Sequence, residues 1–119
     1  MTAFALARTE AGADAALVVV TGDVGPLEAQ DLNEELTACG RDGYRRVVVD
    51  VTDASIDDPD VLAGLYDLAR LMRARDGLVA IAAPRQHGLR TILAATGVTQ
   101  AFTVYDSRRA ALDDLDLDG

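Results

Sequence analysis

Five stretches of the chain carry the dense apolar or alternating pattern that is typical of β-strands. The first alternates through Phe4, Leu6 and Arg8 and predicts a short edge strand, which is followed by a glycine-containing turn over residues 10–14. The other four are rich in β-branched and apolar residues and predict buried strands. They cover residues 16–21, 45–51, 78–83 and 102–105.

The segments between and after these strands repeat their apolar residues with helical spacing. The first predicted helix follows Gly25-Pro26 and ends within residues 40–43, with Leu27, Leu32 and Leu36 marking its apolar side. The second spans 59–75, the third begins at Leu89 and ends at Gly97, and the last follows a cap at Asp106-Ser107.

This order of elements, β-β-α-β-α-β-α-β-α, predicts an α/β fold. Strands that alternate with helices favour a mostly parallel sheet with right-handed crossovers. We therefore expect about five strands with an N-terminal antiparallel hairpin at one edge, and four helices. A chain of 119 residues is expected to form a single domain, 1–119, in which the acidic tail 113–119 frays.

The net negative charge of the chain argues against two classes of binding partner. The chain has 20 acidic and 11 basic residues, a net charge of -9, and every basic residue is arginine. Nucleic acids and anionic membrane surfaces both require clustered cations, so neither is expected as a partner. No apolar stretch approaches the ~18 residues of a membrane span, and no signal-peptide pattern opens the chain, so we expect a cytoplasmic protein.

Acidic residues crowd the start of the second predicted helix. Asp58 can cap this helix, and Pro59 suits its first position because that position needs no backbone N–H. Asp60, with Gly64, Asp67 and Leu71, forms a helical stripe that we interpret as a docking face. Gly64 costs roughly 1 kcal/mol in a helix interior. Close approach of another backbone would explain it, but a tolerated surface glycine is the alternative.

Four motifs in order resemble those of STAS domains of the anti-sigma factor antagonist type. The resemblance covers roughly residues 4–115. The motifs are Thr21-Gly22-Asp23-Val24, the strand end 47–53, Thr96-Gly97-Val98 with residues 102–107, and Ala111-Leu112. It implies a STAS-like fold and a bacterial signalling protein that regulates transcription.

The chain departs from the family at its functional motif, Asp-Ser-Ser-Gly, in which a partner kinase phosphorylates the first serine. Aligned without a gap, this motif falls on residues 58–61, so Pro59 replaces the phosphorylated serine and Asp60 the second serine. A shift by one residue would place Asp58 at the phosphosite instead. Ser55 is nearby but falls in the loop expected before the motif, and Gly25 replaces an aspartate that is frequent in the family.

The resemblance therefore implies a non-catalytic regulator with fixed negative charge at a degenerate phosphosite. Its partner would be an anti-sigma factor or a related serine-kinase-type regulator, and no cofactor or metal is implied. The partner's identity and the oligomeric state stay open. Catalysis finds no motif: His87, the only histidine, is expected in an exposed loop. The predicted partner-binding residues are Asp23, Gly25, Asp57, Asp58, Pro59, Asp60 and Gly64.

Two other functions remain as alternatives. Asp50, Asp53, Asp57 and Asp58 could hold Mg²⁺ in a phosphoacceptor domain, although receiver-type domains also need a lysine and this chain has none. Alternatively, the segment from Gly22 to the helix after Pro26 could form the anion-binding end of a small-ligand sensor for nucleotides or apolar molecules. The surrounding negative charge opposes that second function.

Overall fold

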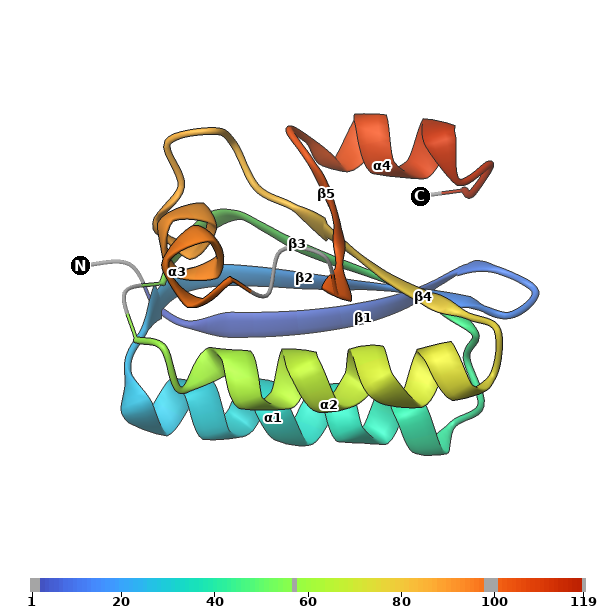
Figure 1. The fold of residues 1–119 in the computed structure, drawn as a ribbon, viewed down its shortest axis with the longest axis horizontal. Helices are drawn as coiled ribbons and strands as arrows, with labels where there is room; N and C mark the ends of the chain where they lie inside the picture. The colour runs from blue at the N-terminus through green and yellow to red at the C-terminus, as the bar shows by residue number, and fades with distance from the viewer. Residues whose placement is uncertain (1–2, 57, 98–100, 119) are drawn as a thin grey trace.

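A five-stranded mixed sheet and four helices form the fold in the computed structural model, which describes residues 3–56, 58–97 and 101–118 (Figure 1). The strands are β1 (Ala5–Gly12), β2 (Ala15–Val24), β3 (Arg46–Ile56), β4 (Leu78–Ala82) and β5 (Thr103–Tyr105). The helices are α1 (Pro26–Arg41), α2 (Val61–Ala74), α3 (Gly88–Thr96) and α4 (Arg108–Asp114). The strands lie in chain order, with β1 antiparallel to β2 and each later pair parallel, which confirms the predicted α/β fold.

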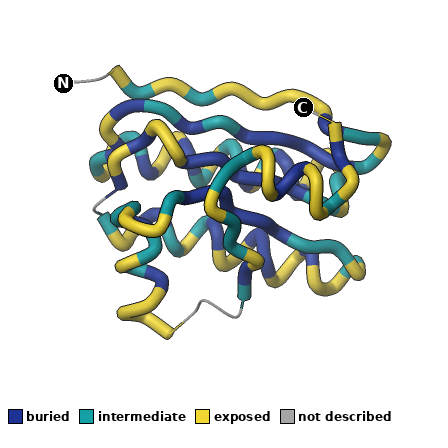
Figure 2. The backbone as a smooth tube through the Cα atoms, turned by 90° about the horizontal axis from the view of Figure 1, so that it is seen from above, coloured by how far each residue is buried: buried dark blue, intermediate teal, exposed yellow. Residues whose placement is uncertain are grey.

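Helices cover both faces of the sheet. In Figure 1, α1 and α2 lie side by side along one face and point in the same direction, while α4 covers the other face. The larger core lies under α1 and α2 and includes the fully buried Leu32 and Leu65; the smaller core lies under α4 and includes Leu112. Figure 2 shows the buried residues concentrated in the central strands. No helix in the described part of the chain is long and apolar enough to cross a bilayer.

β3 is longer than the sequence predicted. The predicted strand ended at Val51 and was followed by an acidic loop over residues 52–58, whereas β3 continues to Ile56. Ala54 and Ile56 are buried and alternate with exposed neighbours, which is the pattern of a strand with one buried face. β3 thus takes up most of the segment that was expected to be a loop.

A β-bulge allows β3 to continue. Val19 pairs with Asp50 and Thr21 with Asp53, so β3 carries one extra residue between these two pairs. The Asp50 Oδ1 atom accepts hydrogen bonds from the Thr52 backbone N at 3.0 Å and the Thr52 Oγ1 at 2.6 Å. Asp50 therefore satisfies a backbone group that the bulge takes out of the strand pairing.

Two expectations for the first two helices were wrong. α2 begins at Val61, two residues later than predicted, and Pro59 and Asp60 form a turn before it. Leu27, expected on the buried side of α1, is 71% exposed. The buried side of α1 is set by residues such as Ala29 and Leu32, and the 3.6-residue period turns Leu27 away from it.

The acidic tail was also predicted incorrectly, because the part that the structure describes packs against the sheet. α4 continues to Asp114, Leu117 is only 9% exposed, and the Asp118 backbone N donates to the Ala11 carbonyl at 2.9 Å. The alternation of leucine with aspartate lets one side of the tail bury its leucines while the carboxylates stay in water.

His87 is partly buried rather than an exposed loop residue. Its Nδ1 atom accepts a hydrogen bond from the Leu89 backbone N at 3.0 Å and so caps α3. The ring proton is therefore on Nε2, which donates to the Ala54 carbonyl at 2.6 Å. This histidine connects α3 to the extended part of β3.

Candidate docking site

The β2–α1 and β3–α2 junctions lie next to each other because β2 and β3 are neighbouring parallel strands. Both junctions are at the left end of Figure 1, where α1 and α2 begin. Together they form an open hollow of about 520 Å³, which we call the junction hollow. It is lined by Asp23, Val24, Gly25, Pro26, Ser55, Asp58 and Pro59. The structure thus brings together four of the residues predicted from sequence: Asp23, Gly25, Asp58 and Pro59.

Gly25 is held at the start of α1 by a hydrogen bond to a side chain of the first turn. Pro26 occupies the first helical position, and the Gly25 backbone N donates to the Glu28 Oε1 atom at 3.0 Å. A Cβ atom at position 25 would lie 3.0 Å from the same Oε1 atom. Glycine therefore leaves room for the carboxylate that caps this helix.

Asp58 holds the turn before α2. Its Oδ1 atom accepts a hydrogen bond from the Asp60 backbone N at 2.9 Å, so it binds a free backbone N–H as predicted, although it lies three residues before the first residue of the helix. Pro59 and Asp60 are exposed. The Asp60 side chain makes no capping hydrogen bond. This turn therefore presents the Asp60 carboxylate to solvent.

Ser55 lines the junction hollow, although it was not among the predicted partner-binding residues. It was expected in a loop, but it lies in β3, exposed and directly opposite Asp23 of β2. It provides the only hydroxyl group among the described residues that line the hollow. The alternation of apolar Ala54 and Ile56 with polar neighbours was the signal that could have placed it in a strand.

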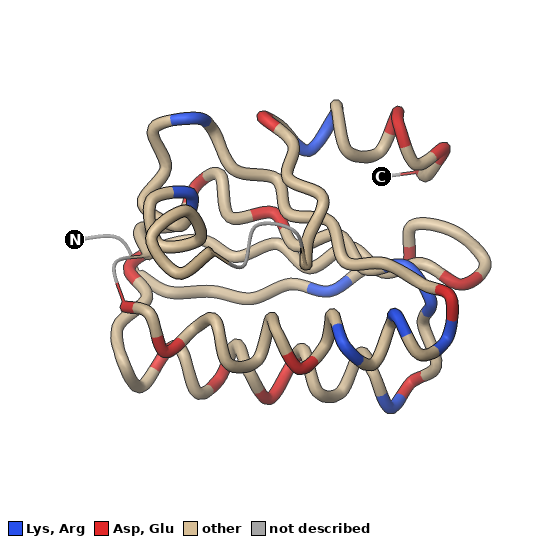
Figure 3. The backbone as a smooth tube through the Cα atoms, viewed as in Figure 1, with Lys and Arg blue, Asp and Glu red and all other residues tan. Residues whose placement is uncertain are grey.

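Carboxylates give this end of the molecule a negative potential. Asp23 and Asp58 line the junction hollow, Asp60 follows directly, and no arginine is among the described lining residues. Figure 3 shows acidic positions at the beginnings of α1 and α2. A phosphate-bearing ligand would be repelled here, so the charge opposes a nucleotide-sensing function.

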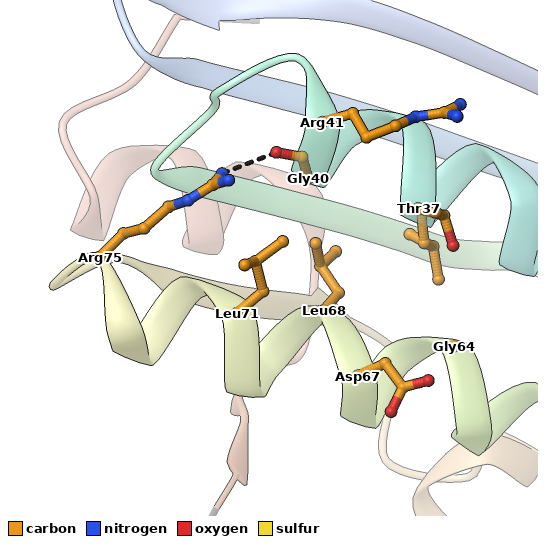
Figure 4. Close-up of a pocket in the computed structure, with 9 residues that line it drawn as sticks. Thr37, Gly40, Arg41, Gly64, Asp67, Leu68, Leu71 and Arg75 are labelled. Atoms are coloured by element: carbon orange, nitrogen blue, oxygen red, sulfur yellow. Dashed lines mark hydrogen bonds between the residues drawn. The ribbon is translucent and has the colours of Figure 1, made fainter.

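Gly64 does not reach the junction hollow. It faces α1, where a Cβ atom added to it would lie 2.0 Å from the Asn33 Oδ1 atom. Further along, Leu71 packs against Gly40 of α1. The predicted stripe through Gly64, Asp67 and Leu71 thus follows the seam between the two helices, as Figure 4 shows.

The carboxylates considered for Mg²⁺ are not assembled into a metal site in the described residues. The Asp50 Oδ2 atom accepts a hydrogen bond from the Arg108 Nε atom at 2.7 Å. Burial alone would raise the pKa of the Asp50 carboxyl, but the bonds from Thr52 and Arg108 outweigh it and hold that pKa below its ordinary value. Within 3–56, 58–97 and 101–118, no three His, Cys, Asp or Glu side chains could share a metal ion. Asp57, which was predicted both as a docking residue and as a possible ligand, lies outside the described residues.

Comparison with known proteins identifies the fold. No protein-family model and no curated protein matches the chain. Solved structures do: an anti-sigma factor antagonist from Mycobacterium paratuberculosis has a TM-score of 0.80 and 18% identity, over 94% of this chain and 93% of that one. A Thermotoga maritima protein assigned as an anti-sigma factor antagonist has a TM-score of 0.78 and 14% identity, over 92% of each chain. The Bacillus cell fate determinant SpoIIAA in its phosphorylated form has a TM-score of 0.73 and 11% identity, over 93% of this chain and 99% of that one. The chain therefore has the STAS fold of the anti-sigma factor antagonists, as its sequence motifs predicted.

Proposed function

We propose that this protein is a non-catalytic, cytoplasmic regulator that resembles an anti-sigma factor antagonist and docks a partner protein on the junction hollow. The partner is an anti-sigma factor or a related serine-kinase-type regulator. The observation that carries this proposal is the convergence of Asp23, Gly25, Asp58 and Pro59, from two junctions, on one exposed hollow in a protein of STAS fold.

Fixed charge replaces a phosphorylation switch in this proposal. A phosphoserine carries about -1.5 to -2 charges at neutral pH, whereas each aspartate carries a permanent single charge. Pro59 has no hydroxyl, and it stands between Asp58 and Asp60 on the exposed turn. We therefore propose that the partner meets a surface whose charge does not change with kinase activity.

Site-specific photo-crosslinking in cells of the source organism tests the docking site. A photoreactive residue at Pro59 is expected to crosslink to one protein of the anti-sigma factor class, whereas the same residue at Arg109, exposed on α4, is the control and is expected to capture nothing specific. Asp58→Asn keeps an oxygen for the Asp60 N–H but removes the charge, so it should weaken binding of the captured partner without unfolding the turn. Equal crosslinking from both positions, or none from position 59, would contradict the proposal.

A kinase reaction tests the fixed charge separately. Incubation with a serine kinase of the anti-sigma factor class and ATP should leave the intact mass unchanged. A stoichiometric gain of one phosphate would refute fixed charge, and its loss in Ser55→Ala would assign the phosphate to the exposed serine of the junction hollow.

A further inference from the structure

The large hydrophobic side chains that reach solvent are concentrated on one layer of the molecule. In the described part of the chain these are Leu27, 71% exposed, Tyr66, 42% exposed, and Leu71, 38% exposed. Leu27 belongs to α1 and the other two to α2. Exposed apolar groups that share one surface indicate an interaction site more strongly than scattered ones do. We call the outward side of α1 and α2 the helical face.

The helical face contains an apolar hollow along the seam between its two helices. This hollow, of about 190 Å³, is lined in part by Gly40, Leu68 and Leu71. Figure 4 shows Arg75 at one end of it, where Arg75 Nη1 donates to the Gly40 carbonyl at 2.7 Å. Engineered cavities of about 150 Å³ bind benzene, so this hollow can take an aliphatic side chain.

Charges divide the helical face into two halves. Acidic positions on the two helices lie mainly in the half nearer the beginnings of the helices, and the arginines lie in the half nearer their ends (Figure 3). Asp42 and Asp76 follow the ends of the helices. The acidic residues are Asp31, Glu34, Asp60 and Asp67, and the basic residues are Arg41, Arg70, Arg73 and Arg75. These residues carry four charges of each sign, and the exposed Asp42 and Asp76 that follow the two helices add two carboxylates, so the charges of this region come closer to balancing than those of the chain, whose net charge is -9.

The helix dipole explains only part of this division. Acidic residues are favourable in the first turn and basic residues in the last turn, and the effect is lost beyond those turns. Asp31, Glu34 and Arg70 lie further inside their helices than one turn. Ion pairing within the chain does not explain the position of Arg70 either. Its Nη1 atom lies 3.8 Å from the Asp67 Oδ1 atom, and both side chains are at least 70% exposed, so this ion pair contributes little to stability.

We infer that the helical face binds a second copy of this chain, related by a two-fold axis that sets the helices of the two copies antiparallel. Because α1 and α2 point the same way, this arrangement places the acidic half of each copy opposite the basic half of the other. It also carries Leu27 of one copy towards the apolar hollow beside Leu71 of the other. Two copies with a net charge of -9 repel each other, and the helical face, where opposite charges would meet, is where they approach at least cost.

The size of the helical face indicates a weak, concentration-dependent dimer. A helix of 16 residues is about 24 Å long, and packed helices lie roughly 8–10 Å apart. Two such helices cover on the order of 500 Å², below the roughly 800 Å² per partner of a standard interface. Association should therefore be detected at high protein concentration and should depend on salt.

A charge-swap experiment tests the dimer. Asp31→Arg with Glu34→Arg removes the excess of negative charge from the acidic half, and Arg70→Glu with Arg73→Glu removes the excess of positive charge from the basic half. Sedimentation velocity at low salt should show wild type dimerising, each variant monomeric, and an equimolar mixture of the two variants dimerising again. Raising the salt should weaken the wild-type dimer at least about tenfold. A monomeric wild type at millimolar concentration, or a monomeric mixture of folded variants, would overturn the inference.

A matched control separates the location of the charges from the net charge. Each Arg→Glu change lowers the net charge by 2, so Arg85→Glu with Arg109→Glu gives -9 - 4 = -13, the same as Arg70→Glu with Arg73→Glu. Both control arginines are exposed, at 82% and 75% of their side chains, and lie off the helical face. This control should dimerise like wild type; its becoming monomeric would show that net charge alone decides association and would overturn the inference.

Disulfide trapping tests the antiparallel arrangement. Leu27→Cys combined with Leu71→Cys should give at least about fivefold more covalent dimer on oxidation than either single variant, because the two-fold axis brings these positions together. The native Cys39 is fully buried and does not compete. Equal yields from single and double variants would contradict this arrangement. None of these experiments contains the anti-sigma factor partner, so their failure would leave the proposed function standing.

Discussion

Replacing Gly64 by alanine tests why α2 contains a glycine in its interior. A Cβ atom at Gly64 would lie 2.0, 2.5 and 2.9 Å from Asn33 Oδ1, Cγ and Cβ. All three atoms belong to one side chain, so Asn33 alone decides whether alanine fits. The Asn33 Oδ1 atom is buried without a hydrogen-bond partner in the described structure, and its Nδ2 reaches the Asp60 carbonyl only at 3.5 Å. Asn33 thus gains little from its place in the helix seam.

The expected effect of Gly64→Ala changes sign with the residue at position 33. Alanine is favoured over glycine in a helix interior by about 1 kcal/mol. Overpacking a filled site costs roughly 1–3 kcal/mol. With Asn33 present, we expect Gly64→Ala to lower the free energy of unfolding by about 1 kcal/mol. Asn33→Ala removes the two closest atoms and leaves the 2.9 Å contact, which a small helix shift relieves. In that background Gly64→Ala should raise stability by up to about 1 kcal/mol.

Urea denaturation of the wild type, both single variants and the double variant measures this coupling. The interaction energy should be about 1–3 kcal/mol, with unchanged m-values. Ala63→Gly is the control, because Ala63 is exposed on the same helix and its effect should not depend on position 33. Effects that add within about 0.5 kcal/mol would refute the steric reasoning and would leave close approach by a partner as the reason for Gly64.

Three further predictions concern the attachment of α4. Asp50→Asn removes the charge paired with Arg108 at 2.7 Å. It should cost about 1–3 kcal/mol near neutral pH in urea denaturation. Because the native pKa of Asp50 is depressed, the ion pair stabilises the wild type fully above the ordinary carboxyl pKa of about 3.9. This stabilisation is lost as the pH falls through the lower native pKa. Plots of unfolding free energy against pH that run parallel for wild type and variant would contradict the pairing. Burial and a hydrogen bond to Asp114 raise the pKa of Tyr105 to about 12, and Asp114→Asn should lower the midpoint of its ultraviolet titration; an unchanged midpoint would assign the shift to burial alone. Ser107→Ala removes the N-cap of α4 and should cost about 1 kcal/mol, whereas Ser107→Asp should retain most of the stability.

The sequence by itself determined the architecture, because each element carries its own local signal. The β-branched run at residues 47–51 predicted a buried strand, and the 3.6-residue period of Leu65, Leu68 and Met72 predicted the buried side of α2. The order of these elements then predicted a mostly parallel sheet. Four of the docking residues could be proposed as well, because a resemblance to a known family supplied their positions.

Local signals failed where a residue's environment comes from a distant segment. Residues 52–56 look like an acidic loop because their polar side chains face solvent, and only pairing with β2 and the bulge filled by Asp50 make them a strand. Gly64 was expected on the outward surface of its helix, whereas the structure places it against Asn33 of α1. The tail was expected to fray because its own sequence does not show that Leu117 packs into the smaller core of the sheet.

The division of charge over the helical face arises only in three dimensions. Along the chain, Arg41 and the three arginines between residues 70 and 75 are separate, and Asp31 and Glu34 belong to a different helix from Asp67. Parallel strands followed by parallel helices place the beginnings of α1 and α2 at one end and their ends at the other. Periodicity fixes which side of each helix is buried, but the relative placement of the two helices depends on the sheet that both pack against, and therefore only the tertiary structure decides which charges share a surface.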